Sequence, residues 1–290
     1  KILLFQASIL YNSTLRIWGA FMILYQFGNS VCAQKVRITL AEKGLDWEAR
    51  EVDLFKSEQY SPEYLKLNPK GVVPTLVHDG RAINESTLIC EYLDTIFPEP
   101  KLMPDDAYKC SQMRLWSKMV DEGLHEGVTE ISFSAMFRQK MKNLTEEERE
   151  LRFKNIGDPR RKDRFFSTYN EGPDSMFVMH AIAAYEKAFN RLEGVLSDGR
   201  DWILGSNYTL ADINLMPYVA RLSYLGLLDI WVKNRPNIKS WWVRSQSLTS
   251  FKLGISNLLT KNDRASMLKH GAEIRGRMQE RYNEYLELLC

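Results

Sequence analysis

Apolar residues in the first third of the chain occur in short runs that polar turns separate. Met22–Tyr25 is too short for a helix and is typical of a buried strand. Trp47–Leu54 and Val72–Val77 are strand-like as well, and Asp79-Gly80 is a hairpin signal that leads into Arg81–Ile83. The pattern therefore predicts a small sheet in this part of the chain.

Helical patterns lie between these runs. Cys32–Lys43 mixes apolar and basic residues and is followed by Gly44, a helix stop. Residues 57–67 include a short helical patch, and Glu85–Phe97 has the apolar spacing of a longer helix. The order βαβ, short helix, ββα predicts a thioredoxin-like α/β domain over residues 22–97.

The periodicity changes after a linker over residues 98–106, a stretch rich in proline. From there the pattern is helical, over residues 107–137, 174–196, 209–227 and 262–289. A polar insertion is expected near 141–173. The predicted fold is an N-terminal thioredoxin-like domain followed by an all-helical domain over 107–290.

Residues 1–21 are interpreted as an extension outside the fold. They are apolar but interrupted by Asn12 and Arg16, so they do not provide the roughly 20 apolar residues that cross a bilayer. We therefore expect no membrane partner. An acid-poor transit peptide is the alternative for this segment.

Composition narrows the function classes. The 39 Lys and Arg residues nearly balance 37 Asp and Glu residues, so nucleic acid is not an expected partner. The 4 cysteines form no CxxC and no metal-ligand spacing with histidine. The expectation is a cytoplasmic, metal-free protein with reduced cysteines.

Three motifs resemble the cytosolic-type glutathione transferases, over about residues 22–255. Asn68–Pro74 is similar to the NPxGxVP segment of that family, Glu85–Leu93 to its third-helix start, and Gly205–Asp212 to a helix entry in its helical domain. Thr209 and Asp212 also form a capping-box pattern, which predicts a structural role for them. The resemblance implies that glutathione is the co-substrate and that the protein is a homodimer.

The resemblance also implies which residues bind glutathione. Val73, before a cis Pro74, would pair with the cysteinyl backbone of glutathione as an added strand. Ser86, at a helix N-terminus, would take the γ-glutamyl carboxylate, and Glu85 the ammonium. Gln59 matches a position that contacts the glycyl end.

The chemistry is expected in the turn Gly28–Cys32. Only the thiolate of glutathione is a good nucleophile, and a hydroxyl donor at a helix N-terminus stabilises it without adding charge. Ser30, in a Ser-x-Cys pattern that serine-type transferases share, is the expected donor, and Asn29 is a lesser alternative. Cys32 is the rival, because a cysteine here forms mixed disulfides with glutathione in omega-like and some dehalogenating relatives. Tyr25 lies too early to be the tyrosine of tyrosine-type classes.

Several segments are similar to the bacterial lignin β-etherases, including Lys56–Ser61 and Met113–Asp121, although Cys32 and Ala33 replace the Asn and Ser of those enzymes. The expected function is attack of the glutathione thiolate on a small hydrophobic, aromatic electrophile, by conjugation or β-aryl ether cleavage. Alternatives are a reductive dehalogenase or thiol transferase that uses Cys32, and a binding module without catalysis. An apolar wall for the electrophile is expected from the helical domain, where about half of the candidates should be core: Trp116, Met119, Phe133, Met136 and Phe137.

Overall fold

The computed structural model describes residues 21–154 and 156–289, so the expected extension lies, apart from Phe21, outside the described residues. The N-terminal part holds a four-stranded sheet in the order β2-β1-β3-β4. Strand β1 pairs in parallel with β2 and antiparallel with β3, and β3 pairs antiparallel with β4. The strands are β1 (Met22–Gln26), β2 (Glu48–Glu51), β3 (Thr75–His78) and β4 (Arg81–Asn84).

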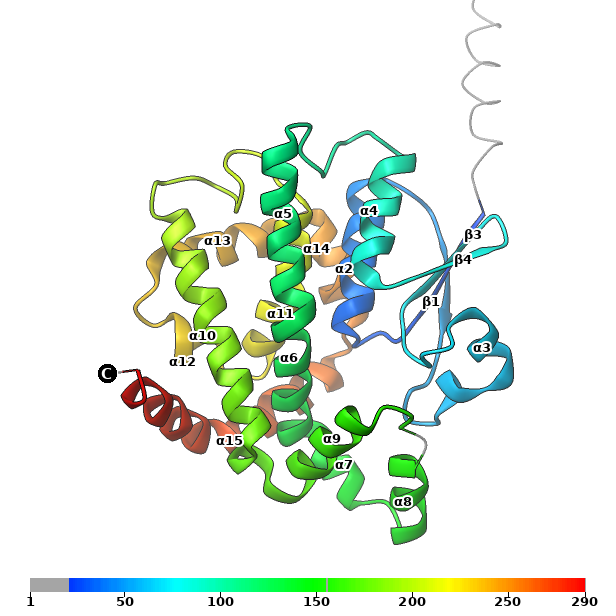
Figure 1. The fold of residues 1–290 in the computed structure, drawn as a ribbon, viewed down its shortest axis with the longest axis vertical. Helices are drawn as coiled ribbons and strands as arrows, with labels where there is room; N and C mark the ends of the chain where they lie inside the picture. Colours follow the sequence, from blue (N-terminus) through cyan, green and yellow to red (C-terminus); the bar gives the residue numbers. More distant parts are fainter. Residues whose placement is uncertain (1–20, 155, 290) are drawn as a thin grey trace, which may run out of the picture.

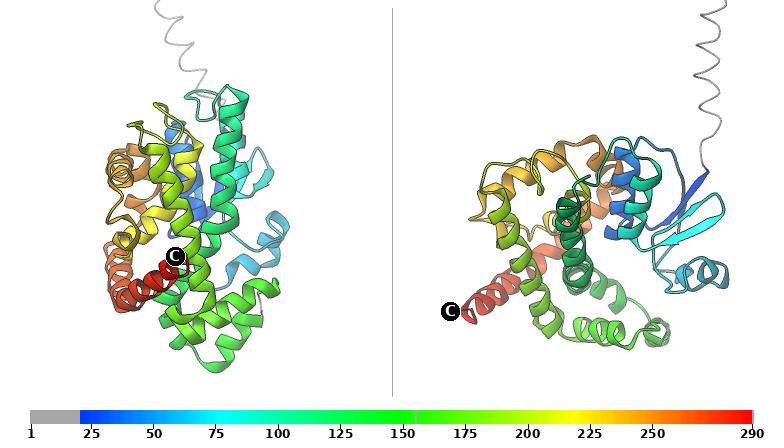
Figure 2. Two further views of the ribbon diagram at one scale, coloured as in Figure 1. Left: turned by 60° about the vertical axis from the view of Figure 1, so that its left-hand side comes forward. Right: turned by 45° about the horizontal axis from the view of Figure 1, so that its top comes forward.

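Helices cover both faces of this sheet. They are α2 (Val31–Glu42), η1 (Glu58–Tyr60), α3 (Pro62–Leu67) and α4 (Ser86–Ile96). Helices α2 and α4 lie between the sheet and the helical domain, and α3 lies on the far side (Figures 1 and 2). Leu24 and Leu76 of the sheet and Val36 and Ile89 of the two inner helices are fully buried. Each such side chain stabilises the fold by about 1.5–3 kcal/mol, and together they make the domain core.

The helical domain fills the rest of the described chain. Its elements are α5 (Ala107–Met119), η2 (Val120–Leu124), α6 (His125–Ser132), η3 (Phe133–Phe137), α7 (Arg138–Lys142), α8 (Glu146–Lys154), α9 (Pro159–Glu171), η4 (Gly172–Asp174), α10 (Met176–Leu196), α11 (Leu210–Tyr224), α12 (Asp229–Val232), α13 (Pro236–Ser247), α14 (Thr249–Gly254), η5 (Ser256–Leu258) and α15 (Lys261–Glu287). Two of these, η2 and η3, are π-helical turns that flank α6. The predicted thioredoxin-like plus helical fold is confirmed.

Helix α11 runs through the centre of this domain, and every residue from Leu210 to Leu222 is buried. The capping box predicted at its start is present: Thr209 caps the helix and Asp212 reaches back to the Thr209 backbone. Along the described chain, no helix is both long enough and apolar enough to cross a membrane.

The strand expected over Trp47–Leu54 is shorter in the structure, at four residues, and its side chains are all exposed. Strand β2 is an edge strand with a single neighbour, which explains why its apolar pattern is weak.

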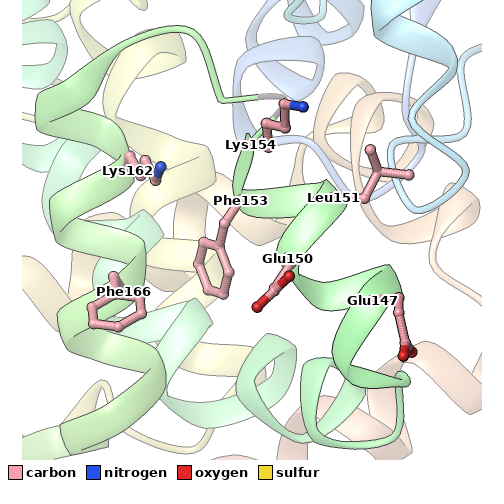
Figure 3. A pocket seen from close by; sticks show the side chains of 7 residues that line it. All are labelled: Glu147, Glu150, Leu151, Phe153, Lys154, Lys162 and Phe166. Carbon is pink, nitrogen blue, oxygen red and sulfur yellow. The ribbon is translucent and has the colours of Figure 1, made fainter.

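The polar segment near 141–173 is helical. Helices α8 and α9 pack side by side, and the rings of Phe153 and Phe166 lie 5.8 Å apart beside a shallow surface hollow (Figure 3). Helix α8 also contacts the N-terminal domain, because Arg152 donates hydrogen bonds to the carbonyls of Phe55, at 3.1 Å, and Leu54, at 3.3 Å.

Candidate functional site

Ser30 lies at the start of α2, as its N-cap. Its Oγ accepts a hydrogen bond from the Ala33 N–H at 3.3 Å. A hydroxyl that accepts one bond still has its own proton to donate. The free N–H groups of the first helical turn and the helix dipole both favour an anion at this end. Ser30 is therefore equipped to donate to a thiolate.

Asn29, beside it, is held by a buried arginine. Arg221 Nη2 lies 2.6 Å from both the carbonyl oxygen and the Oδ1 of Asn29, and Nη1 donates to Ser132 Oγ at 2.8 Å. Burial lowers the pKa of Arg221 to about 10, so the guanidinium keeps its charge at neutral pH. The side-chain oxygen of Asn29 is thus committed to fixing the turn.

Two cationic side chains of α2 also bond to the helical domain. Arg37 donates to the carbonyls of Gly28 and Gly254, each at 2.8 Å. Lys35 donates to Asp121 Oδ1 at 3.1 Å, and its side chain is fully buried. The turn that holds the candidate residues Ser30 and Cys32 is therefore shaped from both domains.

Cys32 faces the helical domain. Its Sγ lies 3.4 Å from Nδ1 of His125, the first residue of α6, and 3.8 Å from the hydroxyl of Tyr218 on α11. The Tyr218 hydroxyl is in turn 3.4 Å from His125 Nδ1. Cys32 is half-buried and His125 is exposed, so solvent reaches the pair.

Electrostatics in this cluster favour a thiolate. Burial raises the pKa of the Cys32 thiol, but the charge and hydrogen bond of His125 outweigh it, with smaller contributions from the Lys35 charge and the Ser86 hydroxyl. The net result is a pKa of about 6, below the ordinary value of 9.0. In return, the charge of the Cys32 thiolate raises the pKa of His125 and outweighs the partial desolvation of the imidazole by neighbouring groups. The two shifts together favour a thiolate on Cys32 beside an imidazolium on His125.

The loop before β3 contains one residue whose backbone N–H and C=O groups are both open. The Val72 carbonyl accepts hydrogen bonds from the Tyr64 hydroxyl at 2.7 Å and from Asn68 Nδ2 at 2.9 Å. The Val73–Pro74 bond is cis, as the resemblance implies. Over residues 21–154 and 156–289, the N–H and C=O groups of Val73 make no hydrogen bond.

Gln59 lies against the same loop. Its side chain is buried, at 7% exposed, and its Oε1 has no partner within the described part of the chain. Gly71 has a φ of +59°, and a Cβ there would lie 2.8 Å from the Tyr60 ring and 3.2 Å from the Gln59 carbonyl. Only glycine fits this approach, which brings Gln59 next to the Asn68–Pro74 segment.

Glu85 and Ser86 stand at the start of α4. The Glu85 carboxylate pairs with Lys70 Nζ at 2.6 Å, and both side chains are largely exposed, so the pair is weak. Ser86 is buried, and its hydroxyl helps to lower the pKa of the Cys32 thiol. The fold therefore places Ser86 near the Cys32 sulfur.

Aromatic rings lead from the turn into the helical domain. The Phe27 and Phe55 centroids are 5.7 Å apart, and Phe55 lies 5.7 Å from Phe137. All three rings keep partial exposure. Of the expected apolar wall, Trp116, Phe133 and Met136 are buried core, while Met119 and Phe137 remain partly exposed.

His125, Tyr218 and Lys35 did not emerge from the sequence. A single histidine in a helical stretch has no motif, and the fold alone brings His125 to a cysteine 93 positions away. In the part of the chain that the structure covers, no three His, Cys, Asp or Glu side chains are placed to share a metal ion.

Comparisons with known proteins give the family. The model described as glutathione S-transferase, N-terminal domain, matches residues 29–96, and that for the C-terminal domain matches residues 148–241. Protein LigF of Sphingobium sp. (strain NBRC 103272 / SYK-6) is 37% identical over 193 residues, 66% of this chain and 74% of LigF. The tetrachloro-p-hydroquinone reductive dehalogenase of Sphingobium chlorophenolicum is 30% identical over 244 residues, 79% of this chain and 93% of that protein. Among solved structures, beta-etherase LigF from strain SYK-6 superimposes with a TM-score of 0.73 at 31% identity, covering 81% of this chain and 99% of that one.

Proposed function

This chain belongs to the glutathione S-transferase family, and on that premise we propose that Ser30 activates glutathione for transfer to a hydrophobic, aromatic electrophile. Glutathione binds along the loop before β3, with Val73, Pro74 and Gln59 on one side and Glu85 and Ser86 at the start of α4. The reaction is conjugation or cleavage of a β-aryl ether.

The observation that carries this proposal is a pair of polar groups without partners on the expected peptide-binding edge. The Val73 peptide and the buried Gln59 amide oxygen both lack hydrogen bonds within the described residues. A buried polar group left unpaired costs about 1–3 kcal/mol. A peptide ligand laid beside the loop removes that cost, because its own N–H and C=O groups pair with both.

Ser30 is the thiolate donor in this proposal. The hydroxyl stabilises the glutathione sulfur by hydrogen bonding to its charged form, which lowers the pKa of the bound thiol. The α2 N-terminus adds a favourable dipole.

The electrophile is aromatic because Phe27, Phe55 and Phe137 form a partly exposed row of rings next to the turn. Aromatic pairs gain about 0.5–1.5 kcal/mol beyond burial, so such a row favours an aromatic guest. The similarity to a beta-etherase points in the same direction. We further propose a homodimer and a cytoplasmic location, as the family resemblance implies.

The test is a titration of glutathione bound to wild type and to Ser30→Ala, followed by the ultraviolet absorbance of the thiolate. The midpoint should rise in the variant, and turnover lost near neutral pH should recover at higher pH. Glutathione affinity should change little, because the peptide is held elsewhere. A midpoint that stays in place in Ser30→Ala and moves in Cys32→Ala would refute the assignment.

A second candidate function is thiol transfer by Cys32. The specific observation in its favour is the 3.4 Å contact between Cys32 Sγ and His125 Nδ1, with the accompanying pKa of about 6 for the thiol. In this reaction the Cys32 thiolate attacks the glutathione sulfur of a disulfide substrate, which forms a Cys32–glutathione mixed disulfide and releases the other thiol. Intact mass of the wild type after turnover should then show a glutathione adduct that Cys32→Ser lacks.

A further inference from the structure

His125 belongs to the helical domain yet touches the sulfur at the start of α2. The π-helical turn η2, Val120–Leu124, immediately precedes it. Such a turn displaces the residues that follow it relative to a regular helix, and π-turns recur at functional sites. Asp121 inside the turn contacts Lys35, while His125 just after it contacts Cys32.

The groups that face Cys32 come from four elements. Lys35 is on α2 itself, Ser86 is on α4, His125 begins α6, and the Tyr218 hydroxyl is on α11. Asp121, whose carboxylate is about half exposed, partly neutralises Lys35 through their 3.1 Å pair. His125 is therefore the cation that lies nearest the sulfur and that solvent also reaches.

We propose that His125 is the acid–base partner of Cys32, taking the thiol proton before attack and returning it to the departing thiol. This inference rests on the second candidate function, thiol transfer by Cys32. The substrate class is a mixed disulfide between glutathione and a small thiol.

The step balances in atoms and electrons. The Cys32 thiolate attacks the glutathione sulfur of the substrate disulfide, the old S–S bond breaks, and a Cys32–glutathione disulfide forms. The small thiol leaves as a thiolate and takes the proton from His125. A second glutathione gives its proton to His125 and attacks the adduct, which releases glutathione disulfide and restores the Cys32 thiolate.

Tyr218 positions the pair. Its hydroxyl lies within reach of both Cys32 Sγ and His125 Nδ1, and burial keeps the pKa of this phenol well above its ordinary value. The phenol therefore stays protonated and donates, which holds the sulfur on the side of the imidazole.

The experiment uses the full chain with His125→Gln and a matched control, His180→Gln, since His180 is an exposed histidine on α10. The first readout is the pH dependence of alkylation of Cys32 by iodoacetamide, with peptide mass analysis to separate it from the other cysteines. The wild-type midpoint should lie near 6, close to the pKa above. It should rise by at least one pH unit in His125→Gln and stay unchanged in the control.

The second readout is exchange with the mixed disulfide of glutathione and cysteine. The rate near pH 6.5 should fall about a hundredfold or more in His125→Gln, the scale of lost acid–base catalysis, and should recover toward wild type near pH 9. In a reciprocal check by NMR, Cys32→Ala should lower the pKa of the His125 imidazole.

An unchanged alkylation midpoint in His125→Gln, or an unchanged His125 titration in Cys32→Ala, overturns the pairing. If both titrations move but neither wild type nor variant exchanges the disulfide, thiol transfer by Cys32 is refuted while the ion pair stands. Exchange that persists in Cys32→Ser refutes thiol transfer by Cys32 and, with it, the acid–base role of His125.

Discussion

Replacing Asp212 with alanine is expected to destabilise the helical domain without reaching the glutathione site. The carboxylate is fully buried and joins three segments. Its Oδ1 accepts from the Ile203 N–H at 3.0 Å and from the Trp241 indole N–H at 2.9 Å, and its Oδ2 accepts from the Thr209 N–H at 3.2 Å. Asp212 therefore completes the capping box with Thr209 and also joins Ile203 and Trp241 to the start of α11.

Two opposing effects set the loss of unfolding free energy in Asp212→Ala. Three buried N–H donors lose their acceptor, at about 2 kcal/mol each, or about 6 kcal/mol together. Against this, burial outweighs the hydrogen bonds and raises the pKa of Asp212 from 3.8 to about 6. At about 1.4 kcal/mol per tenfold change in proton affinity, keeping the group ionised costs about 3 kcal/mol. The net loss near pH 7 is about 3 kcal/mol.

The loss should depend on pH in a defined direction. Because the folded-state pKa is raised, Asp212 contributes stability that is complete below its unfolded value of 3.8 and is lost as the pH rises through about 6. Wild type therefore gains about 1 kcal/mol from this group between pH 7 and pH 5, and the variant does not. The difference in unfolding free energy between the two should widen as the pH falls.

Urea unfolding followed by tryptophan fluorescence at both pH values measures this difference, and calorimetric glutathione affinity serves as the control. A loss below about 0.5 kcal/mol, the usual effect of a surface substitution, would contradict the reasoning. So would a difference that narrows toward pH 5, or a variant with normal stability and no glutathione binding.

Further predictions concern the proposed glutathione site. Ser86→Ala should weaken glutathione binding by about 1–3 kcal/mol, because a buried hydrogen-bond partner is lost. Glu85→Ala should weaken it by only about 1 kcal/mol, because the Glu85 carboxylate is exposed and its ion pairs are weak. Calorimetry that finds both affinities unchanged would argue against the proposed site. Arg152→Ala removes two hydrogen bonds to the loop that precedes Gln59 and should raise the dissociation constant of glutathione about threefold to tenfold. Amide exchange over residues 53–60 should become faster in Arg152→Ala but not in Lys154→Ala, and equal exchange rates in both would show that α8 does not brace the loop.

The sequence was sufficient for the fold because its signals are local. Period-two runs, the Asp79-Gly80 turn and the capping box at Thr209 each act within a few residues, and strands, hairpin and cap are all present. The sequence pattern predicts no individual helix over residues 228–261, although Pro236 stands at the first position of α13, where proline is favoured. The short helices there lack the long periodicity that marks α10 and α15.

The site was only partly predictable, because its chemistry spans both domains. Ser30, Cys32, Val73 and Ser86 follow from motifs, but His125 and Tyr218 approach Cys32 only through packing of the helical domain on α2. A π-helical turn has no sequence signature, so the sequence could not show that His125 lies next to the Cys32 sulfur. For the same reason, the expected apolar wall consists largely of core side chains.

The contact between Arg221 and Asn29 limits which domain exchanges and substitutions this protein can tolerate. Arg221 is 5% exposed, and each of its polar contacts crosses between elements, with Asn29 in one domain and Ser132 in the other. A chimera that joins this helical domain to a different thioredoxin-like domain would bury the guanidinium without the Asn29 acceptors, and each lost hydrogen bond to a charged group costs about 1.5–3 kcal/mol. The same holds in the other direction for Arg37, whose donor to Gly254 would lose its acceptor. The two halves are therefore not interchangeable modules, and substitutions at Asn29 and Arg221, or at Arg37 and the chain around Gly254, should be inherited together.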